Sequence, residues 1–330
     1  SGVGVADALM QPAKTYLQIV GGFCILNALI PICSSYLRAF GFSKEPLYAS
    51  IIGNVINFCL NAFFLFVLHK GVAGVATATV ISRIINLVIV VLLGAVLVKA
   101  KQHPERESNR AVMGQIIRIG LPSACETAIY NVSMTLVIRF LNQMDAQGLN
   151  VTARSYTMQI TNFSYCVGAA LAQANAIMTG WHIGAKEYDA CDRGTRKAAI
   201  IGVIVAVILE TMFALCSGWI MQLFSKDPQM VSLVGKLLAI DIVLEMGRVT
   251  NLVYGQALKT SGDAVFPVVM GACFMILCSV GGTYLFGIRL GLLAVGAYIG
   301  MTGDECVRAV GMYLRWKSGK WKEKGLVKSR

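Results

Sequence analysis

The feature that most constrains this chain is the recurrence of apolar segments long enough to cross a lipid bilayer. A bilayer core of about 30 Å is crossed by about 20 predominantly apolar helical residues. Nine segments meet that length and are separated by short polar connections. We expect the spans near residues 14–37, 47–69, 72–98, 116–139, 151–178, 198–224, 228–256, 265–287 and 291–314. The sequence therefore predicts an all-α membrane protein with nine spans.

The composition agrees with this prediction and argues against a soluble domain. Of the 330 residues, 56% are hydrophobic and 14% are charged, whereas a soluble domain is roughly a quarter charged. The net charge of +12 would suggest a nucleic acid as partner in a soluble protein. Here most Lys and Arg residues lie in alternate loops and the C-terminal tail, which is the pattern of cytoplasmic loops. We therefore expect a lipid bilayer, and no nucleic acid, as the partner of these charges.

One polar segment, residues 99–115, divides the chain and is expected to be a cytoplasmic linker. It separates a partial N-terminal lobe of three spans, residues 1–98, from a C-terminal lobe of six spans, residues 116–316. Residues 317–330 are expected to form a basic cytoplasmic tail. With nine spans and the tail inside, the N-terminus would lie outside, so we expect a fragment that lacks upstream spans.

The sequence carries no pattern typical of an enzyme or a metal centre. The ten cysteines include no C-x-x-C pair, the three histidines include no H-E-x-x-H, and no G-x-x-x-x-G-K-[ST] phosphate loop is present. We therefore expect no enzymatic activity and no cofactor.

A short repeat links the two parts of the chain. The pattern L-R-x-x-G at 37–41, followed by Pro46, matches L-K-x-x-G at 258–262, followed by Pro267. Both copies occupy the cytoplasmic turn before the penultimate span of their half. Paired repeats with a binding site between them are a recurring plan of transporters.

Charged side chains inside the predicted spans are candidate sites because they are costly at bilayer depth. In the span 228–256, Asp241, Glu245 and Arg248 follow an i, i+4, i+7 spacing and share one helix face. One interpretation is a salt bridge between Glu245 and Arg248, which leaves Asp241 unexplained. The other is a net negative cavity wall that takes a proton, a sodium ion or an organic cation.

The depth of Glu126 depends on where its helix begins. If the helix begins at Pro122, the carboxylate complements the helix dipole in the first turn. If it begins near Ile116, Glu126 lies about 15 Å along the helix, with Tyr130 on the same stripe. We favour the deeper placement because a span that begins at Pro122 would barely cross the bilayer.

Further polar stripes are compatible with helix packing or with cavity lining. Gln159 and Asn162 share a stripe on the span 151–178, and Asn57, Asn61 and Thr79 lie on the two last spans of the first lobe. Hydrogen bonds between helices explain such stripes as well as a binding cavity does.

Two further features concern single charged positions. Asp304 and Arg308 stand four residues apart and are expected to form a structural ion pair. Glu210 lies roughly midway through the span 198–224 and has no obvious partner in the sequence.

In chain order, several segments resemble the MATE family, the multidrug and toxic compound extrusion transporters. They are GVAGVATAT at 71–79, IGLPSACE at 119–126, LEMGR at 244–248 with Asn251, LKTSGD at 258–263, and DECVR at 304–308 followed by Arg315 and Trp316. The resemblance implies two pseudo-symmetric lobes of six helices, of which this chain supplies helices four to twelve. It also implies a monomer in the bacterial inner membrane.

The resemblance also assigns candidate residues. Acids of the family on the matching helices are implicated in cation coupling, which corresponds to Glu126 and Glu245 and gives a candidate Na⁺ site there. Asn57, Asn61 and Thr79 match first-lobe cation positions of some members, where an aspartate often stands at the position of Asn61. That departure argues against an ion site in the first lobe.

The leading hypothesis is a secondary active multidrug antiporter. It would export small organic cations in exchange for Na⁺ or H⁺ by alternating access. The first alternative is an exporter or flippase of lipid-linked or anionic precursors, for which the sequence offers only Arg83, Arg154 and Arg248 as intramembrane cations. The second alternative is a non-transporting remnant that lacks three helices.

Overall fold

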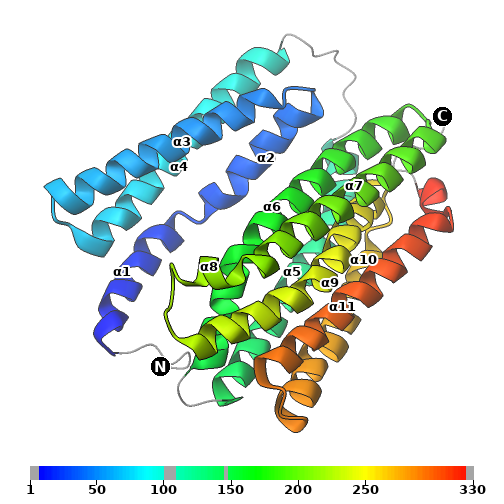
Figure 1. Cartoon of the computed structure of the whole chain (residues 1–330). Helices are drawn as coiled ribbons and strands as arrows, with labels where there is room; N and C mark the ends of the chain where they lie inside the picture. Colours follow the sequence, from blue (N-terminus) through cyan, green and yellow to red (C-terminus); the bar gives the residue numbers. More distant parts are fainter. Residues whose placement is uncertain (1–6, 100–108, 145–147, 325–330) are drawn as a thin grey trace. The chain divides into compact units, whose positions relative to one another are not determined.

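The computed structural model describes residues 7–99, 109–144 and 148–324, and nearly all of them are helical (Figure 1). Contacts divide the chain into two compact units, Ser1–Arg106 and Glu107–Arg330. The boundary between the units falls inside the segment 99–115, which the sequence predicts to be a linker.

The first unit consists of long helices that pack through small and apolar residues. Its elements are α1 (Asp7–Gly22), α2 (Ile25–Ala39), α3 (Lys44–Ala62), the π-helical η1 (Phe63–Val67) and α4 (Gly71–Lys99). Helix α4 contacts α1, α2 and α3. The buried core of the unit is formed by Leu37, Ala49, Val90 and Val98.

The second unit is a helical bundle that surrounds one central helix. Its elements are α5 (Asn109–Met144), α6 (Leu149–Gly184), α7 (Tyr188–Leu215), α8 (Ser217–Met221), α9 (Pro228–Thr260), α10 (Val265–Phe274), the π-helical η2 (Met275–Val280) and η3 (Thr283–Arg289), α11 (Leu293–Lys317) and η4 (Lys320–Lys324). Helix α9 contacts α6, α7 and α11 along its length. Much of α9 is therefore inside protein, and Val243 and Met246 lie on its exposed face.

Glycines allow the neighbours of α9 to approach it closely. A β-carbon on Gly247 of α9 would lie 2.9 Å from the backbone nitrogen of Cys306 on α11. A β-carbon on Gly168 of α6 or Gly202 of α7 would lie 2.7 Å from a methyl group of Val249. Small residues at such positions are typical of membrane helix pairs, because they let the backbones pack without a gap.

The repeated sequence pattern forms the same turn in both units. Gly41 after α2 and Gly262 after α9 have φ values of 90° and 92°. The amide of Phe42 donates to the Leu37 carbonyl at 3.0 Å, and the amide of Asp263 donates to the Leu258 carbonyl at 2.9 Å. Each helix thus ends in a left-handed glycine turn, a conformation that disfavours other residues.

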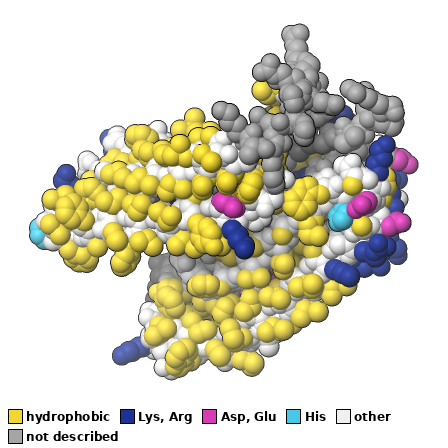
Figure 2. All heavy atoms as spheres, turned by 90° about the horizontal axis from the view of Figure 1, so that it is seen from above, with side chains coloured by type: hydrophobic (Ala, Val, Ile, Leu, Met, Phe, Trp, Pro, Cys, Tyr) yellow, Lys and Arg dark blue, Asp and Glu magenta, His cyan; other side chains and the backbone are white. Residues whose placement is uncertain are grey.

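Apolar side chains cover the outside of the helices, as a bilayer requires. Phe58, Phe66, Leu215, Trp219 and Leu223 are each more than two-thirds exposed. Figure 2 shows hydrophobic side chains over most of the described surface in that view. In the described part of the chain, four helices are long and apolar enough to span a membrane: Lys44–Val67, Gly71–Val98, Tyr188–Leu215 and Val265–Arg289. The pair Lys14–Gly22 and Ile25–Ala39, bent by 43°, would make a fifth span.

Each of the nine predicted apolar segments coincides with one helix or with consecutive helices. The remaining long helices α5, α6, α9 and α11 contain 36, 36, 33 and 25 residues. Their length suffices for a span at 1.5 Å per residue, but polar and charged residues dilute their apolar character. The count of nine spans therefore remains a prediction.

Parts of the predicted linker and of the predicted tail are helical. Helix α5 already begins at Asn109, so it includes residues 109–115 of the linker. In the segment after α11, residues Lys320–Lys324 form a short 3-10 helix against the bundle. Residues 325–330 lie outside the described part of the chain.

The C-terminal segment is held by aromatic stacking and by ion pairs. The rings of Trp316 and Trp321 stack with centroids 4.2 Å apart. Arg315 and Lys324 donate to the buried carboxylate of Asp263 at 2.7 and 2.6 Å. Burial disfavours ionisation of Asp263, but the two basic partners outweigh this cost and hold its pKa below the ordinary value.

Candidate functional site

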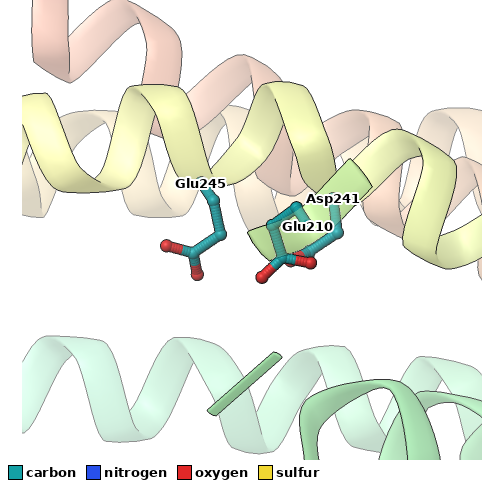
Figure 3. A group of neighbouring side chains, drawn as sticks. All are labelled: Glu210, Asp241 and Glu245. Atoms are coloured by element: carbon teal, nitrogen blue, oxygen red, sulfur yellow. The ribbon is translucent and has the colours of Figure 1, made fainter. Parts of the chain in front are cut away.

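Three carboxylates meet inside the second unit (Figure 3). Glu210 comes from α7, and Asp241 and Glu245 come from successive turns of α9. One oxygen from each lies within 4.8 Å of the oxygens of the other two. All three side chains are buried, and both oxygens of Glu210 and one oxygen each of Asp241 and Glu245 have no hydrogen-bond partner. This three-acid cluster therefore has free acceptor oxygens facing one another.

Arg248 supplies the positive charge beside the cluster. It forms an ion pair with Glu245, three residues earlier on α9, as one of the two sequence interpretations predicts. Its Nε also lies 3.6 Å from the carboxylate of Glu305 on α11. One guanidinium is thus shared between two acids, and it leaves Glu210 and Asp241 unneutralised.

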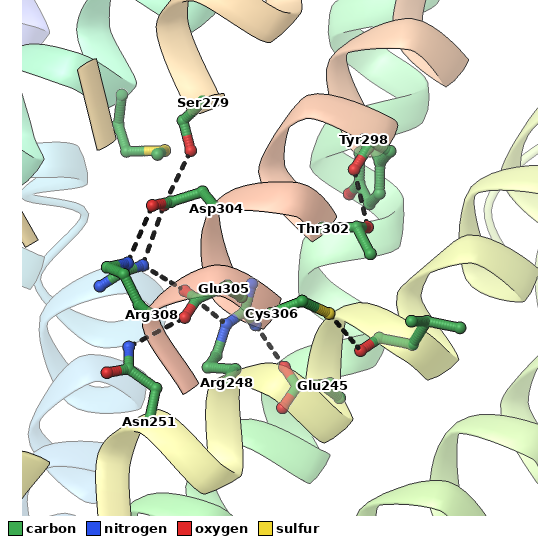
Figure 4. Close-up of polar contacts among 12 residues, drawn as sticks. Glu245, Arg248, Asn251, Ser279, Tyr298, Thr302, Asp304, Glu305, Cys306 and Arg308 are labelled. Atoms are coloured by element: carbon green, nitrogen blue, oxygen red, sulfur yellow. Dashed lines mark hydrogen bonds and ion pairs between the residues drawn. The ribbon is translucent and has the colours of Figure 1, made fainter. Parts of the chain in front are cut away.

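A second network extends along α11 (Figure 4). Arg308 donates to both oxygens of Asp304 at 2.9 Å and to Glu305 at 2.9 Å. Asn251 on α9 donates to the other oxygen of Glu305 at 3.0 Å, and Ser279 donates to Asp304 at 2.9 Å. The expected Asp304–Arg308 ion pair is therefore part of a buried network in which each acid has partners.

The carboxylate of Glu126 is paired with a base that is not beside the three-acid cluster. Helix α5 begins at Asn109 and contains Pro122 in its interior, so Glu126 is not in the first turn of its helix. Its carboxylate accepts a hydrogen bond from Lys259, in the last turn of α9, at 2.6 Å. The pairing of Glu126 with Glu245 as one Na⁺ site stays a prediction.

A cavity of about 410 Å³ runs between α5, α6, α9 and α11. This volume is within the usual range for small-molecule sites. Charged residues of both signs line it: the acids are Glu126, Asp241 and Glu305, and the bases are Arg154, Arg248, Lys259 and Arg308. Asp241 is the member of the three-acid cluster that reaches the cavity, so the cluster and the cavity are contiguous.

Other predicted residues of the second unit are divided between the cavity and the outer surface. Tyr130 of α5 and Asn162 of α6 line the cavity. Gln159 of α6 is exposed and is not among the lining residues. The buried face of α6 instead carries Arg154 and Ser164, which lie outside the predicted polar stripe.

The predicted residues of the first unit are engaged in local hydrogen bonds. Asn57 of α3 donates to Ser82 of α4 at 3.1 Å, and Asn61 donates to the side-chain oxygen of Asn57 at 3.0 Å. Thr79 donates to the Val75 carbonyl of its own helix at 2.9 Å. This arrangement matches the helix-packing interpretation of that stripe.

Sequence reasoning missed three contributors to the site. Glu210 was left without a partner because its partners are on α9, about 30 residues later in the chain. Lys259 was placed in a cytoplasmic loop, whereas the structure keeps α9 helical to Thr260 and brings Lys259 to the cavity. Arg308 was assigned only to its pair with Asp304. The charges of Glu210 and Arg308 are visible within the predicted spans, whereas Lys259 lies beyond the end of its predicted span, 228–256.

Comparison with protein families gives a match to the family model MatE over residues 1–63 and 122–285. An uncharacterized transporter of Bacillus subtilis strain 168, YisQ, is 34% identical over 331 residues, which cover 98% of this chain and 72% of that protein. A probable multidrug resistance protein of Thermotoga maritima, NorM, is 22% identical over 326 residues, which cover 96% of this chain and 68% of that protein.

Solved structures give the same result for the fold. A crystal structure of MATE in the bent conformation superposes with a TM-score of 0.83 at 18% identity and covers 98% of this chain and 72% of that one. A MOP superfamily transporter from Pyrococcus furiosus is described as having a binding pocket of reverse polarity. It superposes with a TM-score of 0.86 at 18% identity and covers 97% of this chain and 73% of that one. At this identity the likeness concerns the fold alone.

Proposed function

The chain belongs to the MatE family, and on that premise we propose that it is a secondary active efflux transporter. It would export small organic cations in exchange for Na⁺ or H⁺ by alternating access. Two relatives carry the name of probable multidrug resistance proteins, which supports an efflux role. The observation that carries the coupling mechanism is the three-acid cluster.

The cluster needs positive charge to be stable in its buried position. Glu210, Asp241 and Glu245 present oxygens within 4.8 Å of one another, and like charges at that distance cannot all persist in a low-dielectric interior. Arg248 neutralises one of them. Bound protons or a monovalent cation such as Na⁺ would satisfy the others, which is the property that an ion-coupled transporter requires.

Competition would link the ion to the cargo. Asp241 belongs to the cluster and also lines the cavity. A cationic substrate near Asp241 and a coupling cation among the same carboxylates would each neutralise the same negative charge, so occupancy by one disfavours the other. Ion entry from one side would therefore promote release of the substrate, and the ion would leave from the other side.

Membrane placement follows from the same family membership and from the apolar helices. The chain is an integral membrane protein. We propose that it lies in a bacterial inner membrane as a monomer, with the basic segment after α11 in the cytoplasm, because Lys and Arg gather in the loops on that side.

An exporter of anionic cargo is the second candidate function. Four basic residues line the cavity, namely Arg154, Arg248, Lys259 and Arg308. Of these four, the sequence alone identified Arg154 and Arg248 as intramembrane cations. Three of the four have carboxylate partners, so the lining as a whole is mixed and not strongly basic. We therefore retain cation exchange as the leading proposal.

Everted membrane vesicles that contain the full chain test this function. A fluorescent organic cation is offered while Na⁺ and pH gradients are imposed separately. We expect accumulation driven by one of the gradients, and a loss of about tenfold or more for Glu245→Gln and Glu210→Gln, because each removes one charge from the ion site. Glu187→Gln is the matched control, since Glu187 is exposed and pairs with His182 outside the cavity.

One result would contradict the assignment of the coupling residues. If Glu245→Gln and Glu210→Gln both leave cation efflux unchanged, these acids do not couple ion movement to export. Efflux in the absence of either gradient would contradict the antiport mechanism itself.

A further inference from the structure

Arg154 is a buried cation for which the proposed mechanism has no use. It lies near the start of α6 and lines the cavity. Only 5% of the residue is exposed, so its guanidinium does not reach the lipid headgroups or water at the outer surface of the bundle.

The guanidinium of Arg154 is poorly satisfied inside the protein. Its Nε is buried without a hydrogen-bond partner among the described residues, and its Nη2 donates to the sulfur of Met134 at 3.7 Å. Among the described residues, no carboxylate lies within ion-pair distance of it. Arg248, Lys259 and Arg308 line the same cavity, and each of them forms an ion pair with an acid.

An unpaired buried charge is among the most costly features of a protein interior. A guanidinium cannot lose its charge at physiological pH, because it does not deprotonate in proteins. Such a group is compatible with a stable fold when a ligand supplies the missing anion. A planar guanidinium fits the paired oxygens of a carboxylate or a phosphate.

The surroundings of Arg154 define the rest of the ligand. Tyr298 of α11 lines the same cavity as Arg154 and Asp241. Met158 and Met301 line the same cavity and offer adaptable apolar contacts. A positive site and a negative site thus share one cavity around a buried tyrosine.

We propose that Arg154 binds the acidic group, a carboxylate or a phosphate, of an amphiphilic ligand whose positively charged part faces Asp241. The organic cations that this cavity binds most tightly would therefore be those that also carry an acidic group. This inference rests on the proposed transport function, since it names the cargo of the same cavity. Equilibrium binding tests it without any ion gradient, so its failure is distinguishable from a failure of coupled transport.

Two dyes that differ at one group provide the test. Rhodamine 110 carries a free carboxylate, and rhodamine 123 is its methyl ester, so the xanthene cation is common to both. Fluorescence anisotropy with the purified full chain measures both affinities. Because a charge-assisted hydrogen bond contributes about 1.5 to 3 kcal/mol, we expect the acid to bind about 10- to 100-fold more tightly than the ester.

The variants separate recognition of the acidic group from a general loss of folding or of dye binding. Arg154→Gln should bring the ratio of the two affinities to about one and leave ester binding in place. Arg154→Lys, which keeps the charge but not the planar fork, should retain part of the preference. Arg289→Gln is the matched control, because Arg289 is exposed and bonds to Tyr284 outside the cavity. Size-exclusion elution and thermal unfolding establish that each variant is folded.

A second measurement identifies the source of the acidic group. Native mass spectrometry in mild detergent reports phospholipid that is retained by the wild type and lost from Arg154→Gln. Phosphatidylglycerol that displaces rhodamine 110 from the wild type would assign the subsite to a lipid phosphate, and no displacement would assign it to a soluble carboxylate. If the wild type and Arg154→Gln have the same dye preference and the same retained lipid, the inference is wrong.

Discussion

Glu210→Gln gives the sharpest test of the three-acid cluster. Glu210 is fully buried, and neither of its carboxylate oxygens has a hydrogen-bond partner. Glutamine has nearly the same shape and removes one negative charge. The substitution should therefore weaken cation binding without opening a cavity in the packing of α7 against α9.

The distance within the cluster sets the size of the effect. The oxygens of Glu210, Asp241 and Glu245 lie within 4.8 Å of one another, so we take this distance as a conservative estimate of the separation between a bound cation and a carboxylate. Coulomb's law then gives an attraction of about 3.5 kcal/mol per carboxylate at an effective dielectric constant of 20, and about 0.9 kcal/mol at 80. Loss of one carboxylate should weaken cation binding by about 10- to 100-fold, between these limits.

Thermal unfolding in detergent measures this loss of cation affinity. A ligand at about 100 times its dissociation constant stabilises the folded state by about 2.7 kcal/mol, whereas at a concentration equal to that constant it contributes about 0.4 kcal/mol. The wild type is titrated with NaCl against choline chloride at constant ionic strength, and then with acid at zero Na⁺. Glu210→Gln should lose most of the stabilisation by whichever ion binds, and Glu187→Gln should keep it.

The reasoning fails if Glu210→Gln keeps the full stabilisation by the ion. That result would mean that the carboxylate does not contribute to a shared cation site. Loss of ion stabilisation in Glu187→Gln as well would also count against the account, because that residue is remote from the cluster.

Three further predictions concern stability and are checked by thermal unfolding. Gly247→Ala places a β-carbon against the backbone of α11 and should cost about 1 to 3 kcal/mol, while Gly194→Ala, which meets nothing within 4 Å, should not destabilise. Trp321→Ala removes the ring stacked on Trp316 and should cost about 3 to 5 kcal/mol. Asp263 has a lowered pKa, so its stabilisation is complete at neutral pH and is lost as the pH falls through the folded-state value. The difference between wild type and Asp263→Asn should therefore shrink in acid, and an unchanged difference would contradict this origin.

The helices were largely predictable because apolar runs and glycine turns are local signals. The repeat at 37–41 and 258–262 predicted two equivalent turns, and the glycines of both have nearly the same φ. The boundaries were less predictable, since α5 begins at Asn109 among polar residues. A hydropathy pattern does not distinguish a polar helix end from a linker.

The candidate site was predictable where its residues share one helix. Asp241, Glu245 and Arg248 were expected on one face of α9 from their spacing, and the ion pair of Glu245 with Arg248 followed from the same rule. Glu210 joins them from α7, and no spacing along the chain reports which helices are neighbours. Arg154 was recognised as an intramembrane cation, but its lack of an acidic partner depends on packing in three dimensions.

Glu126 illustrates the limit of assignment by resemblance. Its place on the first helix of the second unit made it a candidate ligand beside Glu245. In the structure its carboxylate binds Lys259 at 2.6 Å, a partner that is 133 residues away in the chain. The resemblance gives the position of Glu126 on its helix, whereas the packing of α5 against the end of α9 gives its partner Lys259.

Proteoliposomes test the central claim, the exchange of an ion for an organic cation, most directly. The purified full chain is reconstituted, an outward gradient of an organic cation is imposed, and uptake of radioactive Na⁺ and internal acidification are recorded together. The account predicts that one of the two ions enters as the organic cation leaves, and that Glu245→Gln abolishes this exchange. Movement of the organic cation with no movement of either ion would contradict it.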